Sequence, residues 1–193
     1  MSRRASERSV YRREGATWLI EVRLRELRQL FHYLDPAPFR EKDLEPAAES
    51  YIDEAVREIG PSHPCKLVIH LPAAECESPD ARTLPDAIAH YFLYRANQSR
   101  IELRRLLARG LVSLVIGLAF MAACASMRQV AAAGGHDVIA EGLLLIGWVA
   151  LWRPIEIFLY DWWPILRQQA RFAVIARMPV EVRGDSALAQ PVR

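Results

Sequence analysis

The side chains best suited to binding a metal are His63, Cys65, His70 and Cys76, because imidazole and thiolate groups are the usual zinc ligands. Their spacing matches no paired-ligand pattern. Cys65 and His70 fall in or beside an expected strand at an odd separation, which directs their side chains to opposite faces. We therefore predict no metal site and no cofactor.

Carboxylates and histidines offer a second kind of chemistry. Glu49 and Asp53 lie one helical turn apart, a spacing open to paired acid–base catalysis, but the solvated face of a helix accounts for them as well. The sequence contains no nucleophile–base pair and no phosphate-binding loop. An enzyme is the third hypothesis, as a membrane-embedded lipid enzyme that uses His32, Asp35 or His90.

Arg153 and Glu156 form a third group, three residues apart in an otherwise apolar stretch that also contains Pro154. On a helix this spacing allows an ion pair, and charges at membrane depth are often functional. One interpretation is a buried pair that lines a pathway or gates a pore beside a proline kink. The other is an interfacial pair that extends to the headgroups. The aromatic residues of the same candidate site suit a membrane interface: Trp152, Tyr160, Trp162 and Trp163.

Two apolar stretches, residues 110–133 and 138–160, contain this third group. Each is long enough to cross a bilayer, which takes about 20 residues. The four-residue turn between them leaves no room for a domain. We therefore predict a transmembrane helical hairpin.

Arginines are concentrated at the two open ends of this hairpin, whereas its turn region offers only Arg128. The positive-inside bias then places both termini in the cytoplasm. Residues 1–15 lack the apolar core of a signal peptide and are expected to form a flexible basic tail. The expected partners are the lipid bilayer and its anionic headgroups. A net charge of +2 gives no reason to expect a nucleic-acid partner.

Residues 16–82 are expected to form a small cytosolic α/β head. Apolar and polar residues alternate from Thr17, which predicts a strand. Apolar residues then recur at helical spacing from Ala48 to Ile59, and residues 66–71 are typical of a buried strand. Strand, helix and strand make a βαβ unit with parallel strands. Because its edges are open, the sheet needs a further strand, a neighbouring copy or a cover.

The remaining segments connect this head to the membrane. Residues 83–109 are expected to form an amphipathic helix that starts at Thr83 and runs directly into the first span. Residues 161–193 are expected to contain an amphipathic helix on the inner membrane surface, an edge strand at residues 178–182 and a tail. The candidate interface of the head is a proline-rich turn. It comprises Asp35, Pro36, Pro38 and Phe39.

Residues 34–44 and 152–164 resemble the signature segments of a family of uncharacterised bacterial inner-membrane proteins, and the resemblance extends from about Thr17 to Val182. It implies a bacterial protein with two membrane spans. It implies no activity and assigns no catalytic residue.

The sequence thus predicts an α+β membrane protein with a βαβ head, a transmembrane hairpin and a C-terminal amphipathic helix. Our first hypothesis is a multi-pass, non-enzymatic interaction or scaffold protein of the bacterial inner membrane, whose head self-associates or binds a membrane-protein partner. The alternative is an oligomeric channel or transporter component built on Arg153 and Glu156.

Overall fold

The computed structural model describes residues 11–31 and 43–185. It is a mixed α/β structure with two compact units. One comprises Met1–Asn97 and Gln169–Arg193, called the head below, and the other comprises Gln98–Gln168, called the hairpin unit.

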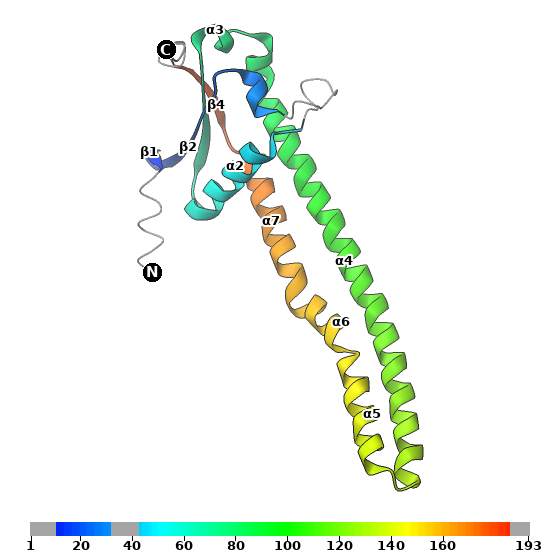
Figure 1. Cartoon of the computed structure of the whole chain (residues 1–193). Coiled ribbons are helices and arrows are strands. Elements are labelled where there is room, and N and C mark those ends of the chain that lie inside the picture. Colours follow the sequence, from blue (N-terminus) through cyan, green and yellow to red (C-terminus); the bar gives the residue numbers. More distant parts are fainter. Residues whose placement is uncertain (1–10, 32–42, 186–193) are drawn as a thin grey trace, which may run out of the picture. The chain divides into compact units, whose positions relative to one another are not determined.

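The head contains a four-stranded sheet in the order β1-β2-β3-β4 (Figure 1). The strands are β1 (Arg12–Glu14), β2 (Thr17–Arg23), β3 (Cys65–Leu71) and β4 (Val180–Gly184). β1 is antiparallel to β2, whereas β2, β3 and β4 are mutually parallel. The parallel pair β2–β3, joined through a helix, confirms the predicted βαβ unit.

Helices make up most of the rest of the described chain. They are η2 (Leu27–Leu30), α2 (Pro46–Ile59), α3 (Ala73–Cys76), α4 (Pro79–Ala133), α5 (Asp137–Val149), α6 (Trp152–Glu156), the π-helical turn η4 (Ile157–Asp161) and α7 (Trp162–Ile175). Residues 98–168 lie between the parallel strands β3 and β4 in the chain. The hairpin unit is therefore an insertion in a crossover connection of the head.

One core holds the head together. The strands contribute alternate apolar residues such as Ile20 and Leu67, and α2 contributes one apolar stripe. Further contributors to this core come from η2, α4 and α7, including Phe92 and Phe172, whose rings lie 5.8 Å apart. The head therefore extends well beyond the predicted residues 16–82.

The C-terminal amphipathic helix has a different partner from the one predicted. Phe172 and Ile175 of α7 are buried in the head core, not presented to a membrane surface. An apolar stripe predicts burial but does not identify what buries it. The predicted edge strand near residues 178–182 is confirmed as β4, which pairs in parallel with β3.

The long helix α4 begins before the predicted Thr83. The Ala81 N–H donates to Ser78 Oγ at 3.1 Å, and Pro79 occupies the first helical position. Serine before proline is a common helix start. Thr83 lies inside the helix, where its hydroxyl donates to the Asp80 carbonyl at 3.1 Å.

The predicted flexible tail of residues 1–15 ends in a strand. β1 pairs with β2 through a two-residue turn in which Gly15 has φ 62°. Such a turn needs a residue that accepts positive φ, and glycine does so without a steric penalty. Residues 1–10 lie outside the described residues.

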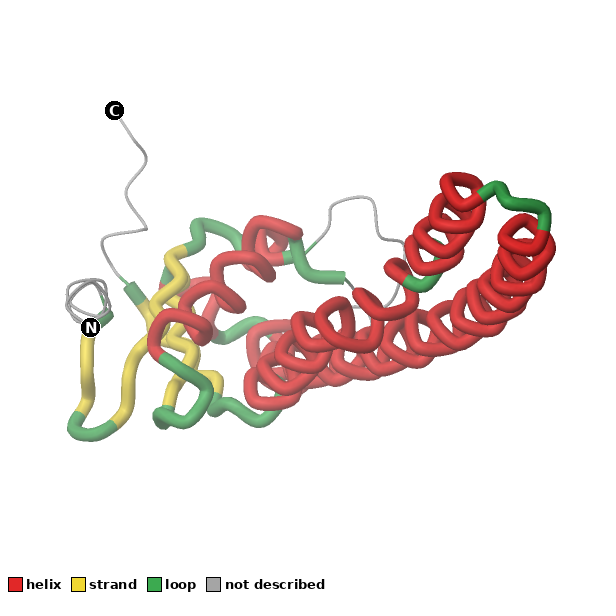
Figure 2. The backbone as a smooth tube through the Cα atoms, turned by 90° about the horizontal axis from the view of Figure 1, so that it is seen from below, coloured by secondary structure: helices red, strands yellow, loops and turns green. Residues whose placement is uncertain are grey.

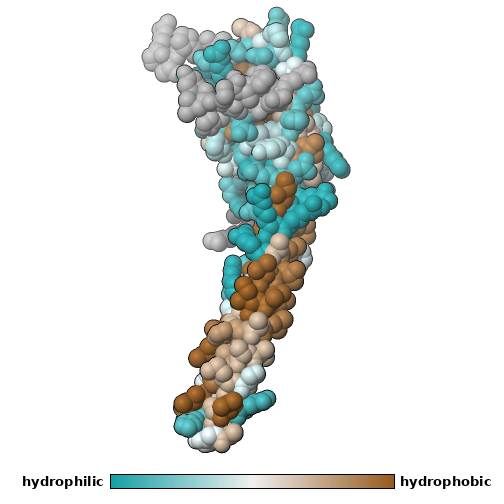
Figure 3. Space-filling view, turned by 90° about the vertical axis from the view of Figure 1, so that its right-hand side faces the viewer, coloured by the Kyte–Doolittle hydropathy of each residue, from teal (hydrophilic) through white to brown (hydrophobic). Residues whose placement is uncertain are grey.

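The hairpin unit contains two helical arms joined by a turn at Gly134 and Gly135 (Figure 2). Two helical segments, Pro79–Ala133 and Asp137–Ile175, are long and apolar enough to cross a membrane. The hydrophobic side chains of the hairpin unit cover much of its surface (Figure 3). Exposed apolar residues in such numbers are unusual for a surface in water.

The second arm, expected as one span over residues 138–160 with a kink at Pro154, is interrupted just before that proline. α5 ends at Val149, and helical structure resumes at Trp152. Pro154 explains the interruption, because it has no N–H to donate to the carbonyl of Ala150 and its ring crowds that carbonyl. The π-helical turn η4 follows directly.

Candidate functional site

The two carboxylates of α2 that suggested acid–base chemistry both have structural partners within the head. Glu49 accepts hydrogen bonds from Arg95 at 2.8 Å and from the Tyr91 hydroxyl at 2.7 Å. Asp53 accepts two from Arg171, at 2.8 and 2.9 Å. These bonds join α2 to α4 and to α7. Glu49 and Asp53 therefore have a structural role, because they connect neighbouring helices of the head.

The metal-ligand candidates are divided between different environments. Cys65 belongs to the buried core, and burial raises the pKa of its thiol, which disfavours the thiolate that binds metals. His70 lies on the other face of the sheet, 3.4 Å from Glu21. Among the described residues no group of three or more His, Cys, Asp or Glu side chains is arranged to hold a metal ion.

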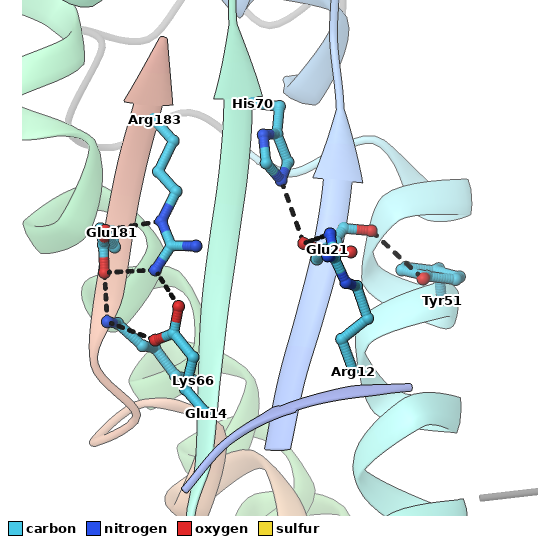
Figure 4. Close-up of polar contacts among 8 residues, drawn as sticks. All are labelled: Arg12, Glu14, Glu21, Tyr51, Lys66, His70, Glu181 and Arg183. Carbon is cyan, nitrogen blue, oxygen red and sulfur yellow. Dashed lines mark hydrogen bonds and ion pairs between the residues drawn. The ribbon is translucent and has the colours of Figure 1, made fainter. Parts of the chain in front are cut away.

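The face of the sheet opposite the core carries a network of charges (Figure 4). Lys66 of β3 forms ion pairs with Glu181 of β4 and with Glu14 of β1. Arg183 bonds to both acids, at 2.7 Å each. Hydrogen bonds from Arg183 and Lys66 lower the pKa of Glu181 to about 2. This face therefore presents alternating charges that already neutralise one another.

Toward β1 the same face contains a second group of polar side chains centred on Glu21 (Figure 4). Its carboxylate lies 3.8 Å from Arg12, and its carbonyl accepts a hydrogen bond from the Tyr51 hydroxyl at 3.3 Å. Burial raises the pKa of Tyr51, and the charge of Glu21 adds to this effect. A hollow of about 330 Å³ adjoins these residues. Its lining contains both acidic and basic side chains and therefore favours neither an anion nor a cation.

β4 forms one edge of the sheet. Leu67 lies opposite Val180, and its N–H donates to the Pro179 carbonyl at 2.9 Å. In a parallel ladder this pattern turns the backbone groups of alternate residues away from β3. The residues whose N–H and C=O point outward are Val180, Val182 and Gly184. Since β4 is the last strand of the sheet, no described strand pairs with them.

The predicted Arg153–Glu156 pair is present in the hairpin unit, with 3.1 Å between Arg153 Nη1 and Glu156 Oε2. Trp152 donates from Nε1 to the other oxygen of Glu156 at 2.9 Å. Arg153 also lies 3.1 Å from Asp161, a partner that sequence reasoning missed. Arg153 and Asp161 are eight residues apart, which is about two helical turns and places both on the same face of a helix. This spacing could have indicated the contact.

The contacts between the two arms show where this charged group lies. A Cβ added at Gly110 would meet Ile157, and one added at Gly117 would meet the Ala150 carbonyl at 3.0 Å. Ile157 therefore lies at the level of Gly110. Arg153, four residues earlier, lies about one helical turn, roughly 5 Å, from that level toward the turn that joins the two arms. Its side chain extends toward Asp161, which is on the Arg109 side of that level. The charged group therefore extends toward the Arg109 end of the hairpin unit.

The aromatic candidates lie at the same end of the hairpin unit. Trp162 donates to the Phe158 carbonyl at 2.8 Å and stacks edge to face on Trp163, with 5.2 Å between centroids. The guanidinium of Arg167 lies 5.0 Å from the Trp163 centroid, and the Tyr160 side chain is exposed. Tryptophan beside arginine is typical of a headgroup interface.

The predicted head interface lies outside the described residues. It comprises Asp35, Pro36, Pro38 and Phe39. His32, which the enzyme hypothesis invokes, also lies outside them. His90, by contrast, is part of α4.

The fold therefore defines a mixed α/β head with an inserted pair of long apolar helical arms that could span a membrane. Comparisons with protein-family models, with curated proteins and with solved structures find no match.

Proposed function

We propose that this chain is a non-enzymatic interaction protein of the bacterial inner membrane, with its head in the cytosol. Residues 110–127 contain no charged side chain. At about 1.5 Å per residue they extend over about 27 Å, close to the thickness of a bilayer core. The bacterial origin rests on the resemblance of residues 34–44 and 152–164 to inner-membrane proteins.

The distribution of arginine supports the orientation. Four arginines precede the charge-free stretch within one segment of α4, whereas Arg128 alone follows it before the turn. The four are Arg100, Arg104, Arg105 and Arg109. Since arginine is enriched on the cytoplasmic side, both arms would enter the membrane from the cytosol and both termini would remain there.

The observation that carries the interaction function is the outer edge of β4. Val180, Val182 and Gly184 turn their backbone groups away from β3, and the strand contains no proline to block pairing. Unpaired strand edges recruit strands from other chains. The added strand would come from a second copy of this chain or from a membrane-protein partner.

A substitution at Val182 tests this mode of assembly selectively. Proline there removes an outward N–H but keeps the bonds to β3, which Glu181 and Arg183 make, and proline is tolerated on edge strands. Val182→Thr is the matched control, because it keeps the N–H and the strand preference. The readout is native mass spectrometry of the full chain extracted from its membrane in mild detergent. We expect the proline variant to lose its protein partners and the threonine variant to keep them. Unchanged assembly in both variants would rule out edge pairing.

The oligomeric channel or transporter component is our second proposal, supported by the three charged residues around the π-helical turn: Arg153, Glu156 and Asp161. Such turns often occur at functional sites. This proposal predicts that Arg153→Gln changes ion or solute flux in liposomes while the protein still inserts. An absence of flux in the wild-type protein would exclude it.

A further inference from the structure

The outer surface of α4 contains an apolar groove at the arginine end of the charge-free stretch. The groove is shallow and widely open, has a volume of about 410 Å³, and is formed by one face of the helix within the hairpin unit. Its lining residues recur at helical spacing: Ala108, Arg109, Val112, Ser113 and Ile116. Val112 and Ile116 are both exposed on the arm, so the groove opens outward.

Positive charge gathers at the arginine end of this groove. Arg105 lies one helical turn before Arg109, and Arg104 is adjacent to it. Within the described part of the chain, none of these three has an ion pair or a hydrogen bond with another side chain. Glu102 is the one acidic residue in this part of α4. The guanidinium groups are therefore available to an anion at the mouth of the groove.

The order of the groups along the helix matches an amphiphile with an anionic head. The arginines come first, the Ser113 hydroxyl follows one turn after Arg109, and the apolar side chains of Val112 and Ile116 continue into the charge-free stretch. A guanidinium binds phosphate through paired hydrogen bonds, and a hydroxyl donates one to a phosphate or ester oxygen. Apolar walls beyond them suit an acyl chain.

We propose that this groove binds one anionic phospholipid from the cytoplasmic leaflet. Arg109, supported by Arg105, holds the phosphate, and the first part of an acyl chain lies along Val112 and Ile116. The site rests on the proposed membrane insertion and goes beyond it, because general attraction to an anionic surface requires neither a groove nor a particular arginine.

The test is native mass spectrometry of the full chain, delipidated in mild detergent and titrated with phosphatidylglycerol or phosphatidylcholine. We expect a first phosphatidylglycerol to bind the wild-type chain more tightly than phosphatidylcholine. Arg109→Gln should weaken that first binding on the order of fivefold or more. Arg128→Gln is the matched control, since it removes the same charge at the other end of the same apolar stretch, and it should have no effect.

Equal binding of the two lipids by the wild-type chain, or equal losses in the Arg109→Gln and Arg128→Gln variants, would overturn the site. Ile116→Trp adds a second criterion, because filling the groove should weaken phosphatidylglycerol binding without changing any charge. Alkaline extraction of native membranes separates this proposal from the proposed function. A chain that stays in the membrane but shows no lipid preference refutes the groove alone, whereas a chain released by alkali refutes the membrane anchor and the groove together.

Discussion

Phe172→Ala tests the finding that α7 belongs to the head core. The Phe172 side chain is 2% exposed, and its ring packs on Phe92 with 5.8 Å between centroids. The Arg95 guanidinium lies 5.6 Å from the same ring. Truncating a buried phenylalanine to alanine costs about 3–5 kcal/mol. Because small domains are stable by about 5–15 kcal/mol, this loss would remove a large part of the stability of the head.

Hydrogen exchange followed by mass spectrometry measures the effect in the full chain in detergent. The amides of β3 are the appropriate reporters, because they lie in the middle of the sheet and open only when the head unfolds. At about 1.4 kcal/mol per factor of ten, we expect their protection to fall between roughly 100-fold and roughly 4,000-fold. Leu166→Ala on the same helix is the control, since Leu166 is 41% exposed and its truncation should change protection little.

A specific result would refute this reasoning. If α7 lay on the lipid surface, as its amphipathic pattern alone suggests, Phe172→Ala would leave the protection of β3 unchanged and would weaken contact with lipid instead. Equal effects of the Phe172 and Leu166 substitutions would also contradict the packing described here.

Three further predictions concern other contacts. Gly117→Ala should lower the thermal stability of the hairpin unit in detergent by about 1–3 kcal/mol, because a Cβ there would lie 3.0 Å from a backbone oxygen of the other arm. Asp53→Asn should destabilise the head to urea by about 1–3 kcal/mol, because it weakens the paired hydrogen bonds from Arg171. The pKa of Glu181 is lowered to about 2 from 4.5, so its ionised form stabilises the head above pH 4.5 and this contribution is lost as the pH falls to about 2. Glu181→Gln should therefore flatten the dependence of the urea midpoint on pH over that interval.

The first two of these predictions have a matched control within the chain. Gly142→Ala gives the same gain in helix propensity with no atom within 4 Å of the new Cβ, so it should not destabilise the hairpin unit. Glu54→Gln breaks an ion pair whose partners are 58% and 61% exposed, and it should cost at most about 0.5 kcal/mol. A variant and its control that behave alike would contradict the corresponding contact. A Glu181→Gln variant with the pH dependence of the wild type would show that its ion pairs contribute nothing to stability.

Local signals in the sequence predicted much of the head. Alternation from Thr17 identified β2, and helical spacing up to Gly60 identified α2, which ends at that glycine with φ 98°. These patterns are reliable because the periodicity of apolar residues depends only on one face being buried, not on which neighbouring element buries it. The start of α4 was missed although Ser78 followed by Pro79 is a capping signal.

Contacts between distant residues could not be predicted in the same way. The bonds from Arg95 and Arg171 to α2 join side chains 46 and 118 positions from their partners, and no periodicity connects them. For the same reason the polar face of α2 suggested a solvated surface. In the candidate site, the Arg153–Glu156 pair was predicted, whereas the third charge, Asp161, was overlooked although it lies on the same helical face as Arg153.

The sequence by itself determined which segments are apolar, how long they are and where the charges lie around them, because hydropathy and helical rise depend only on the order of residues. The tertiary structure alone decided that α7 is buried in the head and that the backbone groups of Val182 point outward. Each of these depends on which distant surfaces meet. An amphipathic pattern predicts that one face of a helix is buried, but only the folded structure shows which residues bury it.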